Sequence, residues 1–178
     1  TDAKETAYPM GLTAGNFVNK NDNFSNVTFV VTDGSLTINP REVTLTSEGA
    51  TKEYDGTPLT RPNVTVSGDG FVDGEVSDIK AIGTITDKGS VPNTITFTEG
   101  ENFKASNYII VRETGTLTIT ADATEVVVYI SGNTGTEKYD GTEKTVTGYK
   151  VTRISNDLYN ESDFAFTGID SVSATDAK

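Results

Sequence analysis

Short runs in which polar and apolar residues alternate recur along most of the chain. They occupy residues 35–38 (Ser-Leu-Thr-Ile), 43–46 (Val-Thr-Leu-Thr) and 116–119 (Thr-Leu-Thr-Ile). Runs rich in β-branched and aromatic residues, at 27–31 and 107–111, also predict strands. Gly and Asp separate these runs, and no segment of ten or more residues holds a clean helical period. The pattern therefore predicts an all-β chain built from short strands.

Three segments depart from simple alternation. Val126–Ile130 is the most apolar run, and it predicts a strand that is buried on both faces or lies between modules. Residues 12–18 are expected to form one short helical turn with Phe17 pointing inward. Strand character resumes over residues 164–169.

One motif occurs twice and indicates a repeat protein. Tyr54-Asp55-Gly56-Thr57 returns 85 positions later as Tyr139-Asp140-Gly141-Thr142. Asp-Gly is also a strong turn signal between strands. Self-similarity at a fixed spacing is the sequence signature of tandem modules.

A second set of matches fixes the order of parts within a module. The segment 34–38 matches 115–119 at a spacing of 81, and Ser25-Asn26 matches Ser106-Asn107 at the same spacing. Only residues 39–119 contain the Tyr-Asp-Gly, Ser-Asn and Gly-x-Leu-Thr-Ile parts in order. We therefore predict a complete module at 39–119, with 1–38 as the C-terminal part of one module and 120–178 as the N-terminal part of a further module.

The two outer parts have a predicted relationship. Thr-Asp-Ala-Lys occurs at 1–4 and again at 175–178, which suggests a parent array with a double-module period of 174. A half-module cannot bury its hydrophobic face alone. Residues 1–38 and 120–178 are therefore expected to complement each other, either within a chain or head-to-tail between chains.

At these motifs the chain resembles the YDG and MBG-type tandem β repeats of bacterial surface proteins. The resemblance covers most of the chain, although Val27 follows Ser25-Asn26 where the Ser-Asn-Tyr part of the motif has Tyr. It implies an extracellular module on the bacterial cell surface, in a long adhesin or stalk, and it transfers no catalytic residue. Some relatives are linked to mucin binding. The expected fold is a small immunoglobulin-like β-sandwich, with a β-grasp-like module that has one short helix as the alternative.

Composition narrows the function. The net charge is −12 and the sequence pI is about 4.3, so nucleic-acid binding is not expected. His and Cys are both absent, which excludes Ser-His and Cys-His nucleophilic enzymes and Cys-based metal sites. No run of 18 apolar residues and no signal peptide is found, so membrane insertion is not expected here. Targeting and anchoring segments are expected outside this piece.

Two groups of residues could form binding sites. Tyr54 and Tyr139 could stack on a sugar or a partner, or they could simply pin strands beside their Asp-Gly turns. Asp73, Glu75 and Asp78 could bind calcium, as could the Asn-rich stretch 19–23, because hard cations prefer oxygen ligands. The alternative for both acidic and Asn-rich clusters is a solvated turn, since neither follows the EF-hand pattern.

A covalent cross-link is a further candidate. Lys52 and Asn107, near the first and last strands of the complete module, could form an isopeptide bond. The residue equivalent to Lys52 in the second Tyr-Asp-Gly copy is Glu137, so the repeat does not support this pair.

These observations predict a non-catalytic repeat module that acts as a stalk or spacer in an adhesin, without a cofactor. The expected partners are neighbouring repeats of the same protein, including head-to-tail self-association. The alternative function is direct binding of a host glycoprotein or a mucin-type glycan.

Overall fold

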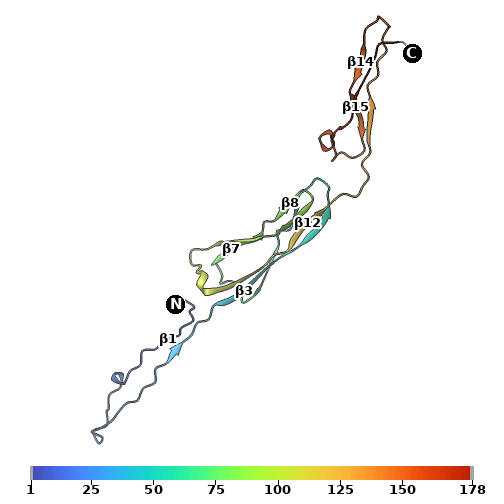
Figure 1. Ribbon diagram of the computed structural model, residues 1–178. Helices are drawn as coiled ribbons and strands as arrows, with labels where there is room; N and C mark the ends of the chain where they lie inside the picture. The colour runs from blue at the N-terminus through green and yellow to red at the C-terminus, as the bar shows by residue number, and fades with distance from the viewer. Residues whose placement is uncertain (1, 177–178) are drawn as a thin grey trace. The chain divides into compact units, whose positions relative to one another are not determined.

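The structure, a computed structural model, describes residues 2–176 and divides into two units. One takes in Thr1–Lys52 and Pro58–Thr120, and the other takes in Glu53–Thr57 and Ala121–Lys178. Strands make up nearly all of the regular structure, which confirms the prediction of an all-β fold (Figure 1). Among the described residues the helical elements are 3-10 turns: η1 (Ala14–Asn16), η2 (Ala105–Asn107) and η3 (Glu161–Asp163). None of them is long or apolar enough to cross a membrane.

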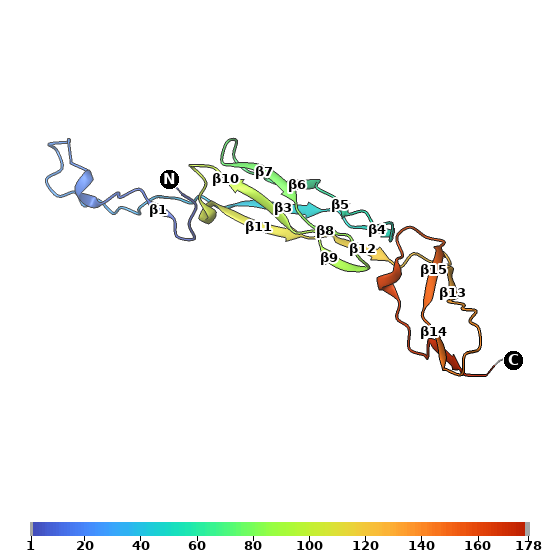
Figure 2. The ribbon, with the colours of Figure 1, turned by 90° about the horizontal axis from the view of Figure 1, so that it is seen from above.

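The first sheet of the complete module holds both its first strand and one of its last. It contains β3 (Arg41–Ser47) between β11 (Tyr108–Glu113) and β6 (Val64–Gly68) (Figure 2). β3 pairs in parallel with β11 and antiparallel with β6. Two of the apolar residues that alternate along β3, Val43 and Leu45, are buried. The alternation seen in the sequence therefore marks the inner face of this sheet.

A second sheet supplies the other side of the core. β7 (Val76–Ala81) and β10 (Ile95–Glu99) pair antiparallel, with a bulge between Thr96 and Thr98. Side chains from both sheets meet in one cluster, as in a sandwich. Its buried members are Val43, Leu45, Ile95 and Tyr108, and its half-buried members are Val64, Phe71, Ile79, Phe97, Phe103 and Ile110.

Smaller sheets close the other end of this module. β12 (Thr116–Thr120) lies between β4 (Ala50–Glu53) and β9 (Gly89–Pro92), and β5 (Leu59–Thr60) pairs with β8 (Thr84–Ile85). Leu117 and Ile119 of β12 are fully buried, and Leu59 and Ala81 are nearly so. The Gly-x-Leu-Thr-Ile repeat therefore encodes a core strand.

Residues 2–38 contain little regular structure. β1 (Tyr8–Pro9) pairs antiparallel with β2 (Ser35–Leu36), and a 3-10 turn forms at η1. The strand predicted at 27–31 is absent, because this segment has no hydrogen-bonded neighbouring strand. Phe17 is exposed rather than inward, and its ring packs at a tilt against that of Phe29, with the ring centroids 5.8 Å apart.

The second unit is a pair of two-stranded sheets. β13 (Val128–Gly132) pairs antiparallel with β15 (Tyr149–Ile154), and β14 (Lys144–Thr147) with β16 (Ser171–Ala174). No residue described in this unit is buried. The interpretation of 126–130 as a strand buried on both faces was therefore wrong. The strand predicted at 164–169 is absent, and the next strand, β16, begins only at Ser171. An isolated two-stranded sheet has no second layer to cover it, which explains the exposure.

Candidate functional site

The two Tyr-Asp-Gly-Thr turns have the same internal geometry. Asp55 Oδ1 accepts hydrogen bonds from the backbone N–H and the hydroxyl of Thr57, at 2.9 and 2.7 Å. Asp140 Oδ1 accepts the same two bonds from Thr142, at 3.0 and 2.6 Å. The glycine between them has a positive φ in both copies, which a residue with a Cβ adopts only with strain. Each of the three motif positions after Tyr thus has a local structural role.

The second turn also carries an ion pair. Lys144 Nζ lies 2.6 Å from Asp140 Oδ2. The hydrogen bond from Lys144 has the largest effect on the pKa of the Asp140 carboxyl, and those from Thr142 come next. All of them lower this pKa below its ordinary value. Both side chains are well exposed to solvent, so the pair contributes little to stability.

The two motif tyrosines lie in different surroundings. Tyr54 is half-buried and lines a cavity of about 190 Å³ with Asp122, Asn156 and Leu158. Tyr139 is 67% exposed. Neither hydroxyl makes a hydrogen bond to another described residue.

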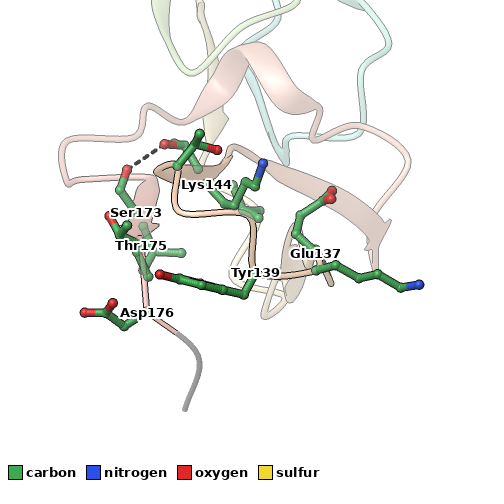
Figure 3. Close-up of a pocket in the computed structure, with 13 residues that line it drawn as sticks. Glu137, Tyr139, Lys144, Ser173, Thr175 and Asp176 are labelled. Atoms are coloured by element: carbon green, nitrogen blue, oxygen red, sulfur yellow. Dashed lines mark hydrogen bonds between the residues drawn. The ribbon is translucent and has the colours of Figure 1, made fainter.

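Tyr139 borders an open cavity of about 280 Å³ in the second unit. Figure 3 shows its ring lying across the cavity, with the hydroxyl directed toward Ser173 of β16 and Thr175, which follows that strand. Lys144 lines the same cavity, and across its floor the hydroxyl of Thr145 lies 2.6 Å from that of Ser173. The walls come from residues 135–139, from β14 and from β16 with the residues after it.

A larger and more apolar cavity of about 450 Å³ lies in the same unit. Its apolar lining residues come from both small sheets and from the segment before β16: Ile130, Val146, Tyr149, Phe164, Phe166, Ile169 and Val172. Ile130, Phe166, Ile169 and Val172 are exposed. These side chains form an uncovered apolar surface of the kind that marks an interaction site.

The strand pairing of the second unit matches that of the complete module. Leu45 pairs with Val66 and Ser47 with Val64 between β3 and β6. Residues 85 positions later pair in the same way between β13 and β15, because Ile130 faces Val151 and Gly132 faces Tyr149. The spacing that separates the two tyrosines therefore also separates two equivalent strand pairs.

The structure does not bring the predicted calcium ligands together. Glu75 accepts a hydrogen bond from the Tyr108 hydroxyl at 2.6 Å, and Asp78 forms an ion pair with Lys80 at 2.7 Å. Asp73 joins neither contact. Within residues 2–176, no three acidic side chains gather in a way that could hold a metal ion. The Asn-rich stretch 19–23 forms a loop held by its own amides.

Tyr108, whose hydroxyl donates the hydrogen bond to Glu75, is buried. Its hydroxyl also accepts a hydrogen bond from the Val72 N–H at 3.1 Å. Burial, and then the Glu75 hydrogen bond, raise the pKa of the Tyr108 phenol. Glu75 is therefore engaged in closing the module core.

The proposed isopeptide partners are also separated. Asn107 precedes Tyr108, which pairs with the first residue of β3, whereas Lys52 lies in β4, beyond the last residue of β3. The seven residues of β3 span roughly 20 Å. The Asn107 amide instead accepts a hydrogen bond from the Ala3 N–H at 2.8 Å.

Sequence reasoning missed a buried residue, Asn93, that joins several loops. Its Oδ1 accepts from the Gly83 N–H at 3.1 Å, and its Nδ2 donates to the carbonyls of Glu48 and Arg61 at 2.9 and 2.7 Å. Its own carbonyl accepts from the Ser47 hydroxyl at 2.6 Å. In the sequence Asn93 only begins an alternating run, so no local signal separates it from a surface residue.

Comparison with protein-family models, with curated proteins and with solved structures finds no match. The resemblance to YDG and MBG-type repeats therefore stays a prediction from the motifs.

Proposed function

We propose that this chain is a non-catalytic tandem repeat module that acts as a stalk or spacer in a bacterial cell-surface protein of the adhesin type. Its role is to hold other parts of the parent at a distance and to bear tension along the chain. Two features of the complete module support this role: where its aromatic side chains lie, and how its first strand, β3, pairs with a late strand, β11.

Four of the five aromatic side chains of the complete module, all except Tyr54, lie in its core cluster. Phe71, Phe97 and Phe103 surround Tyr108 with ring centroids 5.2–6.4 Å apart. None of these four is exposed. Exposed aromatic rings are what protein surfaces commonly use to anchor partners and ligands. Their placement inside the core favours a structural role for this module.

The observation that carries the proposal is the parallel pairing of β3 and β11. Six residue pairs join them, from Tyr108 opposite Arg41 to Glu113 opposite Thr46. Because the strands run in the same direction, pulling the start of β3 away from the end of β11 loads their hydrogen bonds in shear. The bonds must then break together, which raises the barrier to forced unfolding. A spacer in a surface stalk would need this property.

Force spectroscopy on the whole chain tests this role, with cysteine handles that are unique because the chain has no cysteine. Handles at Asn39→Cys and Thr114→Cys load β3 and β11 in shear. Handles at Asn39→Cys and Ser106→Cys pull on the starts of both strands and unzip them one bond at a time. All three positions are exposed, so the handles should not disturb the fold.

We expect the shear pair to rupture at a force several-fold higher than the unzipping pair. The comparison uses one fold and changes only the direction of loading, so it isolates the strand geometry. Equal rupture forces in the two directions would remove the support for a tension-bearing spacer.

A further inference from the structure

We propose that residues 8–38 of one copy of this chain, the head segment, fill the open face of residues 121–176 of another copy, the tail unit. Together they would form a composite module with the same strand arrangement as residues 39–120. This inference goes beyond the spacer role and does not depend on it, because it concerns only which surfaces fit each other.

The tail unit reproduces one half of the complete module. Its β13–β15 pairing is equivalent to β3–β6, as shown above. Its β14–β16 pairing is equivalent to β5–β8: Thr60 pairs with Thr84, and Thr145 pairs with Ser173. The tail unit therefore presents the surfaces on which β11 and β12 rest in the complete module.

The head segment reproduces the other half. In the complete module, Leu117 pairs with Val91 and Thr116 with Pro92. In the head segment, Leu36 pairs with Tyr8 and Ser35 with Pro9. Both the Gly-x-Leu-Thr-Ile strand and its proline-ended partner are thus present in the same register. β2 and β1 are the equivalents of β12 and β9.

Burial shows what each half lacks. Leu117 and Leu45 are fully buried in the complete module, at 0% exposure. Their equivalents are Leu36 in the head segment, 59% exposed, and Ile130 in the tail unit, 53% exposed. The side chains that fill a core in one case face solvent in the other. Covering them would recover about 25 cal/mol for each Å² of apolar surface removed from water.

The cavities of the tail unit lie where the missing strands would go. In the complete module β12 packs against β4, β5 and β8. The cavity of about 280 Å³ in Figure 3 is lined by the equivalents of these elements: residues 135–139, β14 and β16. It is therefore the place for β2 of the head segment, with Leu36 and Ile38 directed inward as Leu117 and Ile119 are.

The larger cavity corresponds to the place of Asn93 and β10. Met10 follows Pro9 as Asn93 follows Pro92, and Met10 is 68% exposed. A methionine suits this cavity because its lining is apolar, with Ile130 and Tyr149 on one side. The position held by Asn93 in the complete module is thus held by Met10 in the head segment, where the receiving cavity is apolar.

Both halves also keep an unpaired strand edge. β3 has β11 on one side and β6 on the other, whereas β13 pairs only with β15 among the described residues. The head residues equivalent to β11, 27–31, form no strand. In the composite module Phe29 would lie opposite Val128, as Ile110 lies opposite Val43. Unpaired edges are known sites of strand addition.

The test measures the molar mass of the full chain by light scattering over about three decades of concentration. The wild-type chain should grow from single copies to long head-to-tail assemblies, because each copy carries one head and one tail. Leu36→Asp places a charge in the head, and Ile130→Asp places one in the tail. Each variant alone should lose all assembly and keep the mass of one chain, 18.9 kDa.

Mixing the two variants is the decisive step. The Leu36→Asp chain keeps a working tail, and the Ile130→Asp chain keeps a working head. An equimolar mixture should therefore give a 1:1 dimer with twice the mass of one chain and no larger species. Non-specific hydrophobic association would not stop at a dimer.

Two substitutions at positions outside the proposed contact serve as matched controls. Val30→Asp changes a head residue that is 93% exposed and whose equivalent, Val111, also faces outward. Val127→Glu changes a tail residue whose equivalent is the exposed Glu42. Both controls should assemble as the wild type does. A wild-type chain that stays monomeric at every concentration, or a variant mixture that stays monomeric, would overturn the proposal.

Discussion

At the scale of single residues, the buried amide of Asn93 holds the complete module together more than its motif residues do. It is fully buried, and Asn93 bonds to groups on three separate segments, at residues 47–48, at Arg61 and at Gly83. Asn93→Ala would leave the Gly83 N–H and the carbonyls of Glu48 and Arg61 without partners. Each unsatisfied buried group costs about 1–3 kcal/mol. We expect the free energy of unfolding to fall by at least about 3 kcal/mol, measured by urea denaturation.

Asn102→Ala is the matched control, because it removes the same side chain from an exposed loop of the same module. It should change the free energy of unfolding by no more than about 0.5 kcal/mol. If the two variants unfold at the same urea concentration, the Asn93 bonds do not stabilise the module in the way described.

The contrast between Asn93 and the Tyr-Asp-Gly-Thr motif shows what a sequence can reveal at this scale. The motif forms its bonds within three residues, so its turn could be predicted from Asp, Gly and Thr alone. Asn93 bonds to residues 10 to 45 positions away. Its role depends on the tertiary fold, and a single sequence carries no local sign of it.

At the scale of elements, the repeated segment 115–119 differs from its copy at 34–38 in one residue, Thr116 in place of Ser35, and in what surrounds it. A Cβ on Gly115 would lie 2.3 Å from the backbone carbonyl carbon of Glu48, which cannot move aside easily. A Cβ on Gly34 would meet only the end of the flexible Met10 side chain, at 3.1 Å. The same substitution should therefore have different results at the two equivalent positions.

We expect Gly115→Ala to destabilise the complete module by about 2 kcal/mol or more, measured as a lower urea midpoint. Gly34→Ala should leave that midpoint unchanged. If the head segment docks as proposed, Gly34→Ala should nevertheless weaken head-to-tail assembly, because Gly34 would then meet backbone as Gly115 does. A Gly34→Ala chain that assembles as well as the wild type would argue against the equivalence of the two strands.

The same reasoning explains which elements could be predicted from the sequence. Alternation correctly marked β3 and β12, because their partner strands are present and bury one face. Richness in apolar and β-branched residues was a weaker guide: the strand predicted at 27–31 is absent, and the burial predicted at 126–130 is not seen, because the described structure supplies no cover there. A periodic pattern predicts which face of a strand can be buried. That face is buried only where a neighbouring strand or sheet is present to cover it.

At the scale of the whole molecule, the charge opposes the assembly that the exposed surfaces favour. Each copy carries a net charge of −12, so two copies repel each other at long range. The proposed contact itself is apolar, built on residues such as Leu36 and Ile130. Added salt shortens the Debye length from about 30 Å at 0.01 M to about 8 Å at 0.15 M and screens the repulsion.

Head-to-tail assembly should therefore strengthen as sodium chloride is raised over this range, with the apparent dissociation constant falling several-fold in sedimentation experiments. Assembly held by ion pairs between copies would weaken over the same range, because salt screens attraction as well as repulsion. The Leu36→Asp chain should remain a single copy at every salt concentration. Salt-induced growth of that variant would show that the association comes from general loss of repulsion and not from the fit between head and tail.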